Sequence, residues 1–162
     1  MGADDYCTML VCENGHVLTD CLERSSNNTP YCSRCGARTI SRCPSCGSKI
    51  RGDLRDPGAV VIGFITPAPS YCPECGAPFP WTMASLEALR ELAELDDELG
   101  SEDVDALVRS AERAMTENPK TEVAAMRVKK ILTKAGKATA SAARDLLVDV
   151  LAESAKRAIW PA

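Results

Sequence analysis

The sequence predicts a small α+β fold, in which a cysteine-rich N-terminal module is followed by an all-α module of about four helices. Two observations support this prediction. All nine cysteines and eight of the ten glycines lie at or before residue 76, whereas residues 82–162 are rich in alanine and leucine. Glycine, proline and cysteine are typical of turns, while alanine and leucine favour helices. We therefore expect two modules, residues 1–81 and residues 82–162.

Charge and hydropathy exclude several classes of protein. The 162 residues carry a net charge of -4, which excludes a uniformly basic nucleic-acid coat but not a local basic patch. The sequence has no run of 18 apolar residues, so no membrane span is predicted. The segment MGADDYCTML lacks the pattern of a signal peptide. We expect a cytoplasmic protein with no membrane partner. In a reducing compartment, its cysteines favour metal binding over disulfides.

Four ligand pairs stand out among the cysteines. Three of them read CSRCG, CPSCG and CPECG, and the fourth is Cys12 with His16, which follows Gly15. A Cys-x-x-Cys turn can place two thiolates on one metal ion, and eight ligands fill two closed tetrahedral sites, as in structural zinc sites. The sequence therefore predicts two structural Zn²⁺ ions. The expected ligands are Cys12, His16, Cys32, Cys35, Cys43, Cys46, Cys72 and Cys75.

An internal repeat indicates which pairs share a metal ion. Residues 31–37 and residues 71–77 both read Y-C-x-x-C-G-A, which suggests that each is the second half of a zinc ribbon. The favoured arrangement is a tandem zinc-ribbon-like module, with site one formed by the first two pairs and site two by the last two. A cross-brace that alternates the pairs, as in RING-type domains, stays open as the other arrangement.

Two cysteines and one apolar segment fall outside this pattern. Cys7 and Cys21 are the competitors of His16 as ligands, and otherwise we expect them to be free thiols that pack as small buried hydrophobic groups. Residues 60–65, Val-Val-Ile-Gly-Phe-Ile, are rich in β-branched side chains and predict a strand. A ribbon this small cannot bury that strand alone, so we expect it to pack on the helices or on a partner.

Four helices are expected in the second module. We expect Thr82 to cap a first helix that ends near Leu99, and Ser101 to cap a second that ends before Pro119. Thr121 is expected to cap a third helix, and a fourth runs without interruption over residues 138–159. The third helix should bury Val123, Met126, Ile131 and Leu132 on one face.

Charge is segregated along these helices. Residues 87–105 carry nine acids and one arginine, while residues 120–137 carry six bases and only Glu122 as an acid. We expect the two faces to lie near each other as solvated surfaces with weak ion pairs. The alternative is a basic third helix that binds an anionic partner.

These motifs together resemble one bacterial family, the domain of unknown function 2321. The resemblance rests on Cys-x-Asn-Gly-His at 12–16, the CSRCG and CPSCG turns, the stretch from VVIGF to PWT at 60–82, and the late KAGK and RDLLVD segments. It covers nearly the whole chain. It implies a zinc-ribbon-like region followed by helices, with the same eight ligands, and it implies no activity.

The leading hypothesis for function is a non-enzymatic zinc-binding adaptor that contacts other proteins. Its C-terminal helices could also join copies of the chain into a homo-oligomer. The alternative is nucleic-acid binding through the basic segment 34–55, with Tyr31 and Phe64 as stacking groups. A RING-like ligase adaptor would follow from the cross-brace. We expect no catalysis, because the only histidine is a ligand and both zinc sites are filled by protein groups. The six bases of the segment are Arg34, Arg38, Arg42, Lys49, Arg51 and Arg55.

Overall fold

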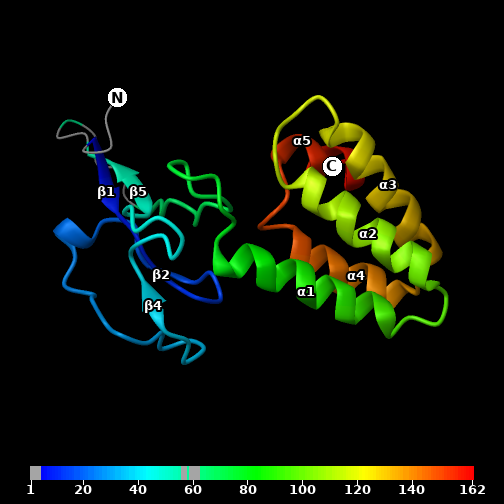
Figure 1. Cartoon of the computed structure of the whole chain (residues 1–162), viewed down its shortest axis with the longest axis horizontal. Coiled ribbons are helices and arrows are strands. Elements are labelled where there is room, and N and C mark those ends of the chain that lie inside the picture. Colours follow the sequence, from blue (N-terminus) through cyan, green and yellow to red (C-terminus); the bar gives the residue numbers. More distant parts are fainter. Residues whose placement is uncertain (1–4, 56–57, 59–62) are drawn as a thin grey trace. The chain divides into compact units, whose positions relative to one another are not determined.

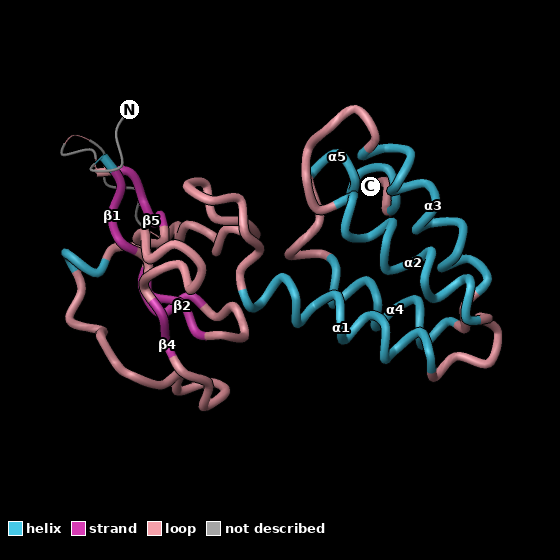
Figure 2. The backbone as a smooth tube through the Cα atoms, in the orientation of Figure 1, coloured by secondary structure: helices cyan, strands magenta, loops and turns pink. Residues whose placement is uncertain are grey.

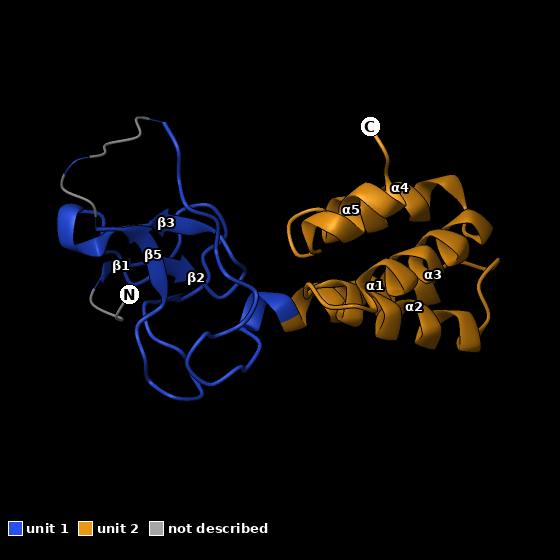
Figure 3. Cartoon of the chain, turned by 90° about the horizontal axis from the view of Figure 1, so that it is seen from above, with its two compact units in different colours: residues 1–82 blue, residues 83–162 orange. Residues whose placement is uncertain are grey.

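The computed structural model describes residues 5–55, 58 and 63–162. The first part of the chain has short strands and the second part has helices (Figure 1). Together with the cysteine clusters of the first part, this confirms the predicted α+β class. Most of the first part is loop, and most of the second is helix (Figure 2). The chain divides into two compact units, residues 1–82 and residues 83–162 (Figure 3).

Two small antiparallel sheets form the first unit. β1 pairs with β5, and β2 lies between β3 and β4. Met9 alone separates β1 from β2, and its N–H donates to the carbonyl of Ile50 at 2.9 Å, so a single residue links the two sheets. The strands are β1 (Tyr6–Thr8), β2 (Leu10–Cys12), β3 (Val17–Thr19), β4 (Thr39–Ile40) and β5 (Arg51–Leu54).

The core of the first unit joins these strands to the cysteine turns. Phe79 and Trp81 stack with ring centroids 4.7 Å apart, and the indole N–H of Trp81 donates to the carbonyl of Pro69. Because two predicted ligands belong to the cluster, the core depends on the geometry of the second cysteine site. The buried members are Met9, Val11, Cys43, Ile50, Cys72, Phe79 and Trp81.

The strand expected over residues 60–65 is only partly within the described residues. Residues 60–62 lie outside them, and residues 63–65 form a turn and loop instead of a strand. Phe64 and Ile65 are each 64% exposed, so these two side chains do not pack into a core as we expected.

Five helices are described in the second part of the chain, in place of about four. They are α1 (Pro80–Glu94), α2 (Ser101–Ala114), α3 (Thr121–Lys134), α4 (Lys137–Leu147) and α5 (Glu153–Ile159). α3 packs against α2, α4 and α5. None of these described helices is long and apolar enough to cross a membrane.

The expected fourth helix is interrupted, and the cause is tertiary. The N–H of Ala152 donates to the carbonyl of Ala114 at 3.0 Å, which draws the chain out of helical geometry between α4 and α5. The carboxylate of Glu117 then accepts the N–H of Ser154 in the first turn of α5. Both partners come from the end of α2 and the loop that follows it, so local sequence patterns do not reveal the break.

The first helix also differs from its prediction at both ends. α1 starts at Pro80, and Thr82 is not its cap, because the Thr82 hydroxyl donates to the carbonyl of Ser70 at 2.7 Å. α1 ends at Glu94, since Asp96 turns inward and accepts hydrogen bonds from Glu98 and Gly136. Ser101 and Thr121 were expected to cap α2 and α3, but they are the first residues within these helices. Gly100 and Lys120 occupy the cap positions, so each helix begins one residue earlier than predicted.

The buried face of α3 is not the predicted one. Ile131 and Leu132 are buried, but Val123 and Met126 are 54% and 55% exposed. Their places in the core are taken by small or β-branched residues, which let the neighbouring helices approach α3 closely. The buried residues of α3 are Thr121, Ala124, Ala125, Val128, Ile131 and Leu132.

Candidate metal centres

The three Cys-x-x-Cys turns share one backbone conformation. In each, the N–H of the first cysteine donates to the carbonyl five residues later, at 2.8 to 2.9 Å, and the glycine N–H donates back to that cysteine. This glycine has a φ of +73° to +77°, a region that other residues rarely adopt. An antiparallel bridge closes each turn: Tyr31 with Arg38, Arg42 with Lys49, and Tyr71 with Pro78. The repeat noted in the sequence therefore has a third structural copy at residues 42–49.

Cys12 and His16 form a related turn at the tip of the β2–β3 hairpin. The N–H of Cys12 donates to the carbonyl of His16 at 3.0 Å, and the N–H of Gly15 donates to the carbonyl of Cys12 at 2.8 Å. Gly15 has a φ of +88°, and a Cβ atom there would lie 3.0 Å from the Cβ of Trp81. Glycine is thus required both by the turn and by the packing of the core against it.

Site one brings together Cys12, His16, Cys32 and Cys35, whose ligand atoms all lie within 4.8 Å of one another. The Sγ atoms of Cys12 and Cys35 are 3.7 Å apart. The Nδ1 atom of His16 lies 3.5 Å from the Sγ of Cys12 and 3.7 Å from the Sγ of Cys32. A tetrahedral zinc ion with bonds of about 2.3 Å to sulfur and about 2.0 Å to nitrogen separates its ligands by about 3.5 to 3.8 Å. The donor set therefore fits zinc.

Site two brings together Cys43, Cys46, Cys72 and Cys75, again within 4.8 Å. Cys43 and Cys75 have their Sγ atoms 3.8 Å apart, and so do Cys46 and Cys72. These separations match the edge of a tetrahedron around a zinc ion with four sulfur ligands, about 3.8 Å. The pairs thus combine sequentially along the chain, and the alternating cross-brace is not the arrangement found among the described residues.

The surroundings of the thiols change their pKa values in opposite directions. A backbone hydrogen bond at Ala37 lowers the pKa of Cys35 to about 6. Burial raises the pKa of Cys12. The hydroxyl of Ser48, 2.9 Å from the Sγ of Cys46, lowers the pKa of that thiol.

Two thiols of site two have pKa values shifted in opposite directions. Burial opposes ionisation of Cys72, but hydrogen bonds, first that from Ser48, lower its pKa to about 6. A hydrogen bond at Ala77 favours the Cys75 thiolate, yet burial and the three neighbouring thiols raise its pKa to about 12. Four thiols this close cannot all ionise unless a cation balances their charge, which is what a metal ion supplies.

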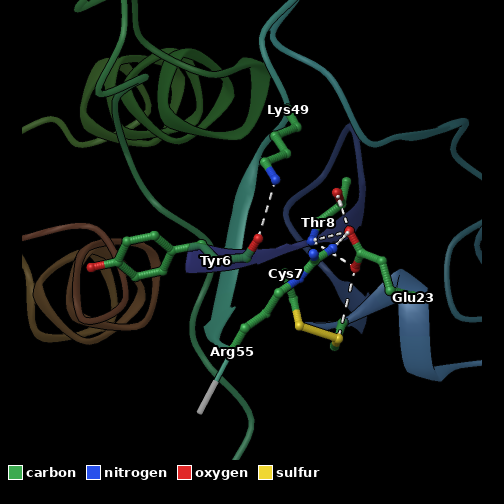
Figure 4. Close-up of polar contacts among 7 residues, drawn as sticks. Tyr6, Cys7, Thr8, Glu23, Lys49 and Arg55 are labelled. Carbon is green, nitrogen blue, oxygen red and sulfur yellow. Dashed lines mark hydrogen bonds and ion pairs between the residues drawn. A yellow bond between two sulfur atoms is a disulfide. The ribbon is translucent and has the colours of Figure 1, made fainter. Parts of the chain in front are cut away.

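The two remaining cysteines form a disulfide, which corrects the expectation of free thiols. Cys7 and Cys21 are bonded, with Cα atoms 4.7 Å apart, and both are buried (Figure 4). The bond joins β1 to the residue before the 3-10 helix η2 (Leu22–Arg24). Neither cysteine has a partner at Cys-x-x-Cys spacing, so their pairing depends on strand packing that the sequence pattern does not show.

Glu23 ties the same region together. Its carboxylate accepts the N–H and the hydroxyl of Thr8 and forms an ion pair with Arg55 at 2.7 Å (Figure 4). Burial opposes ionisation of Glu23, but the two bonds from Thr8 and the bond from Arg55 lower its pKa to about 2. No sequence pattern marks Glu23, because η2 and β1 come together only in the folded chain.

Most of the basic segment 34–55 is engaged within the chain. Arg42 donates to the carbonyl of Gly47, and Lys49 donates to the carbonyl of Tyr6. Arg51 lies over the Tyr6 ring at 4.9 Å and pairs with Glu74. Since Arg55 pairs with Glu23, only Arg34 and Arg38 have side chains without a hydrogen bond or ion pair within the described part of the chain. The other four cations, Arg42, Lys49, Arg51 and Arg55, thus have a structural role.

Comparison with known proteins places the chain in a family. The family model DUF2321, described as an uncharacterized protein conserved in bacteria, matches residues 5–159. The chain belongs to the DUF2321 family. No curated protein and no solved structure matches it. The match spans both the cysteine sites and the helices.

Proposed function

We propose that this DUF2321 protein holds one structural zinc ion at each cysteine site and serves as a non-enzymatic adaptor that binds other proteins. The observation that carries the proposal is the pair of four-ligand clusters, whose sulfur and nitrogen atoms have the spacing of tetrahedral zinc sites. Zinc at these sites would supply folding energy, because the ligands come from segments far apart in the sequence.

A structural role is favoured over a catalytic one by the number of ligands. Catalytic zinc keeps a coordination position open for water or substrate, with three protein ligands. Each cluster here offers four protein ligands, three cysteines with a histidine in site one and four cysteines in site two. A zinc ion in either cluster would have no free position for a substrate.

The adaptor role is supported by the shape of the cysteine turns. Residues 33–36, 44–47 and 73–76 form their tips, and all twelve of these residues are exposed. The three tips share a backbone conformation but differ in their side chains, as in Arg34 and Glu74. Bound zinc would hold the tips rigid, and a rigid surface loses little entropy when it binds a partner.

Metal analysis tests the zinc assignment. We expect two zinc ions per chain, and one after either Cys35→Ser or Cys75→Ser. The matched control is Cys7→Ala with Cys21→Ala, which removes the disulfide and should keep both ions. A single zinc ion in the unaltered protein, or iron in its place, would contradict the proposal. Chelation should also shift the emission of buried Trp81 to longer wavelength, measured in a Trp160→Phe background.

Cobalt substitution tests whether the sites are closed. Cobalt in a closed tetrahedral site should keep its visible spectrum when azide or thiocyanate is added, because no position is free to bind the anion. A spectral change on addition of either anion would indicate an open site and would favour catalysis.

The adaptor role needs its own test. Partners recovered with the protein from its own bacterial host should be lost with Arg34→Glu or Glu74→Lys, while both variants keep two zinc ions. An unchanged set of partners in both tip variants would count against recognition by the cysteine turns.

Nucleic-acid binding is the second candidate, and one observation favours it. Tyr31 is 63% exposed and pairs across its turn with Arg38, so an aromatic ring and an unengaged cation lie on neighbouring positions. An electrophoretic shift of single-stranded RNA or DNA at low salt that Arg34→Glu with Arg38→Glu abolishes would support it. If no shift occurs at low salt, this function is excluded.

A further inference from the structure

The outer face of α3 carries an open groove. Its volume is about 720 Å³, and Val123 and Met126 supply its apolar surface while Arg127 and Lys130 supply positive charge. The opposite face of α3 is buried against α2, α4 and α5. The groove therefore belongs to a helix that the fold fixes on one side and leaves uncovered on the other.

The cations of this groove are unequal. Lys129 reaches the carbonyl of Ala158 at 3.5 Å, and Lys134 pairs with Asp103 at 3.0 Å, so both are engaged within the unit. Arg127 and Lys130 are exposed and make no hydrogen bond or ion pair with the residues that the structure describes. With Glu122 as the only acid lining it, the groove is apolar and positively charged.

The turn after α1 has the complementary character. Leu95 is 83% exposed, the largest exposed fraction among the large apolar side chains described. It is surrounded in sequence by the exposed acids Glu91, Glu94, Asp97 and Glu98. An apolar side chain within a group of carboxylates is what an apolar groove with cationic edges would accept.

This turn is held in place. The side chain of Asp96 accepts the N–H of Glu98 and the N–H of Gly136, both at 2.9 Å, and Leu99 is buried at its end. The backbone around Leu95 is thus fixed to the start of α4. A side chain presented from a fixed turn loses little conformational freedom when it binds.

We propose that a second copy of this chain places its Leu95 turn in the α3 groove. Leu95 contacts Val123 and Met126, and the acids around it face Arg127 and Lys130. Because the turn and the groove are different surfaces, the contact is head-to-tail and leaves one free turn and one free groove at the ends of each pair. The chain then forms closed rings or open chains. This association does not depend on the metal sites, so it and the proposed zinc function can fail separately.

The test uses two variants that each disable one surface. Leu95→Arg removes the turn, and Met126→Glu with Lys130→Glu removes the groove. Sedimentation should show concentration-dependent association of the unaltered protein from about 1 to 300 µM at low salt, and weaker association at high salt. Each variant alone should bind at least tenfold more weakly. An equimolar mixture should form a one-to-one dimer and nothing larger, because one intact surface of each kind remains.

Met83→Arg is the matched control, because Met83 is also a half-exposed apolar side chain and should be dispensable. Far-ultraviolet circular dichroism checks that all variants keep their helices. The proposal is overturned if the unaltered protein stays monomeric over the whole range, if the variants associate as it does, or if their mixture stays monomeric. If the protein is a monomer, the remaining candidate to bind the groove is an acidic segment of another protein.

Discussion

The carboxylate of Glu117 accepts two hydrogen bonds from Ser154, one from its N–H at 3.1 Å and one from its hydroxyl at 2.6 Å. Glu117 lies in the loop after α2, and Ser154 lies in the first turn of α5, 37 residues later. The N-terminal N–H groups of a helix have no partner within the helix, so Glu117 satisfies one of them from another part of the fold. These bonds from Ser154 also lower the pKa of Glu117.

Replacing Glu117 with alanine should release α5. A helix of seven residues is too short to be stable alone, so it depends on its cap and on packing. We expect the melting temperature of the helical unit to fall by a few degrees and hydrogen exchange to rise over residues 153–159. Glu112→Ala, at an exposed position of α2, is the control and should leave exchange in α5 unchanged. Equal protection of α5 in both variants would show that packing alone holds it.

The features that could be predicted are those fixed by residues close in sequence. The features that could not are contacts between residues far apart in sequence. Each Cys-x-x-Cys turn, and the turn from Cys12 to His16, is fixed within about eight residues by its own hydrogen bonds, which is why the sequence identified the eight clustered residues. The Cys7–Cys21 bond and the contact of Glu117 with Ser154 depend on which segments pack together. Periodicity also misplaced Val123 and Met126, because alanines next to them suit the crowded inner face of α3 better.

Asp96 should make the helical unit sensitive to acid. Hydrogen bonds from the Thr139 hydroxyl and from the N–H groups of Glu98 and Gly136 lower the pKa of this carboxyl below its usual value of 3.8. A carboxylate with a lowered pKa in the folded state stabilises the fold above the unfolded pKa, and the contribution is lost as the pH falls below it. We expect the melting temperature, followed by circular dichroism, to decrease when the pH is lowered below about 4.

Asp96→Asn is the variant that isolates this effect. An amide cannot titrate, so the variant should be less stable at neutral pH and should lose less stability on acidification than the unaltered protein. Asp97→Asn, at the exposed neighbouring position, provides the control and should keep the original pH profile. If Asp96→Asn and the unaltered protein have parallel profiles, the sensitivity comes from other carboxyls.

Gly52 should tolerate no side chain. It lies in β5, and a Cβ atom at this position would overlap the backbone carbonyl oxygen of Asp20 and lie 3.3 Å from the carbonyl oxygen of Cys7. The Asp20 carbonyl oxygen also accepts the N–H of Asp53 at 2.9 Å, and Cys7 lies in β1, the partner of β5, so neither can move away without disturbing these bonds. We therefore expect Gly52→Ala to abolish the blue-shifted emission of Trp81 in a Trp160→Phe background.

The control for this substitution is Gly100→Ala. Nothing lies within 4 Å of a Cβ atom there, and its φ of -78° suits any residue. Its melting temperature should differ little from that of the unaltered protein. Normal zinc content and unchanged Trp81 emission in Gly52→Ala would show that β5 can shift away from Asp20, contrary to the close packing described.

The Cys7–Cys21 disulfide should stabilise the first unit without taking part in metal binding. It closes a loop with a sequence separation of 14 residues, and a loop of that length confers about 3 kcal/mol in the chain-entropy model. Cys7→Ala with Cys21→Ala should therefore lower the unfolding midpoint in denaturant. It should keep two zinc ions per chain, because neither sulfur belongs to a four-ligand cluster. Thiol titration of the chelated, denatured protein should count seven thiols without reductant and nine with it. Nine thiols in the protein as purified would mean that the bond is absent, and the double variant would then lose only the packing of two small side chains.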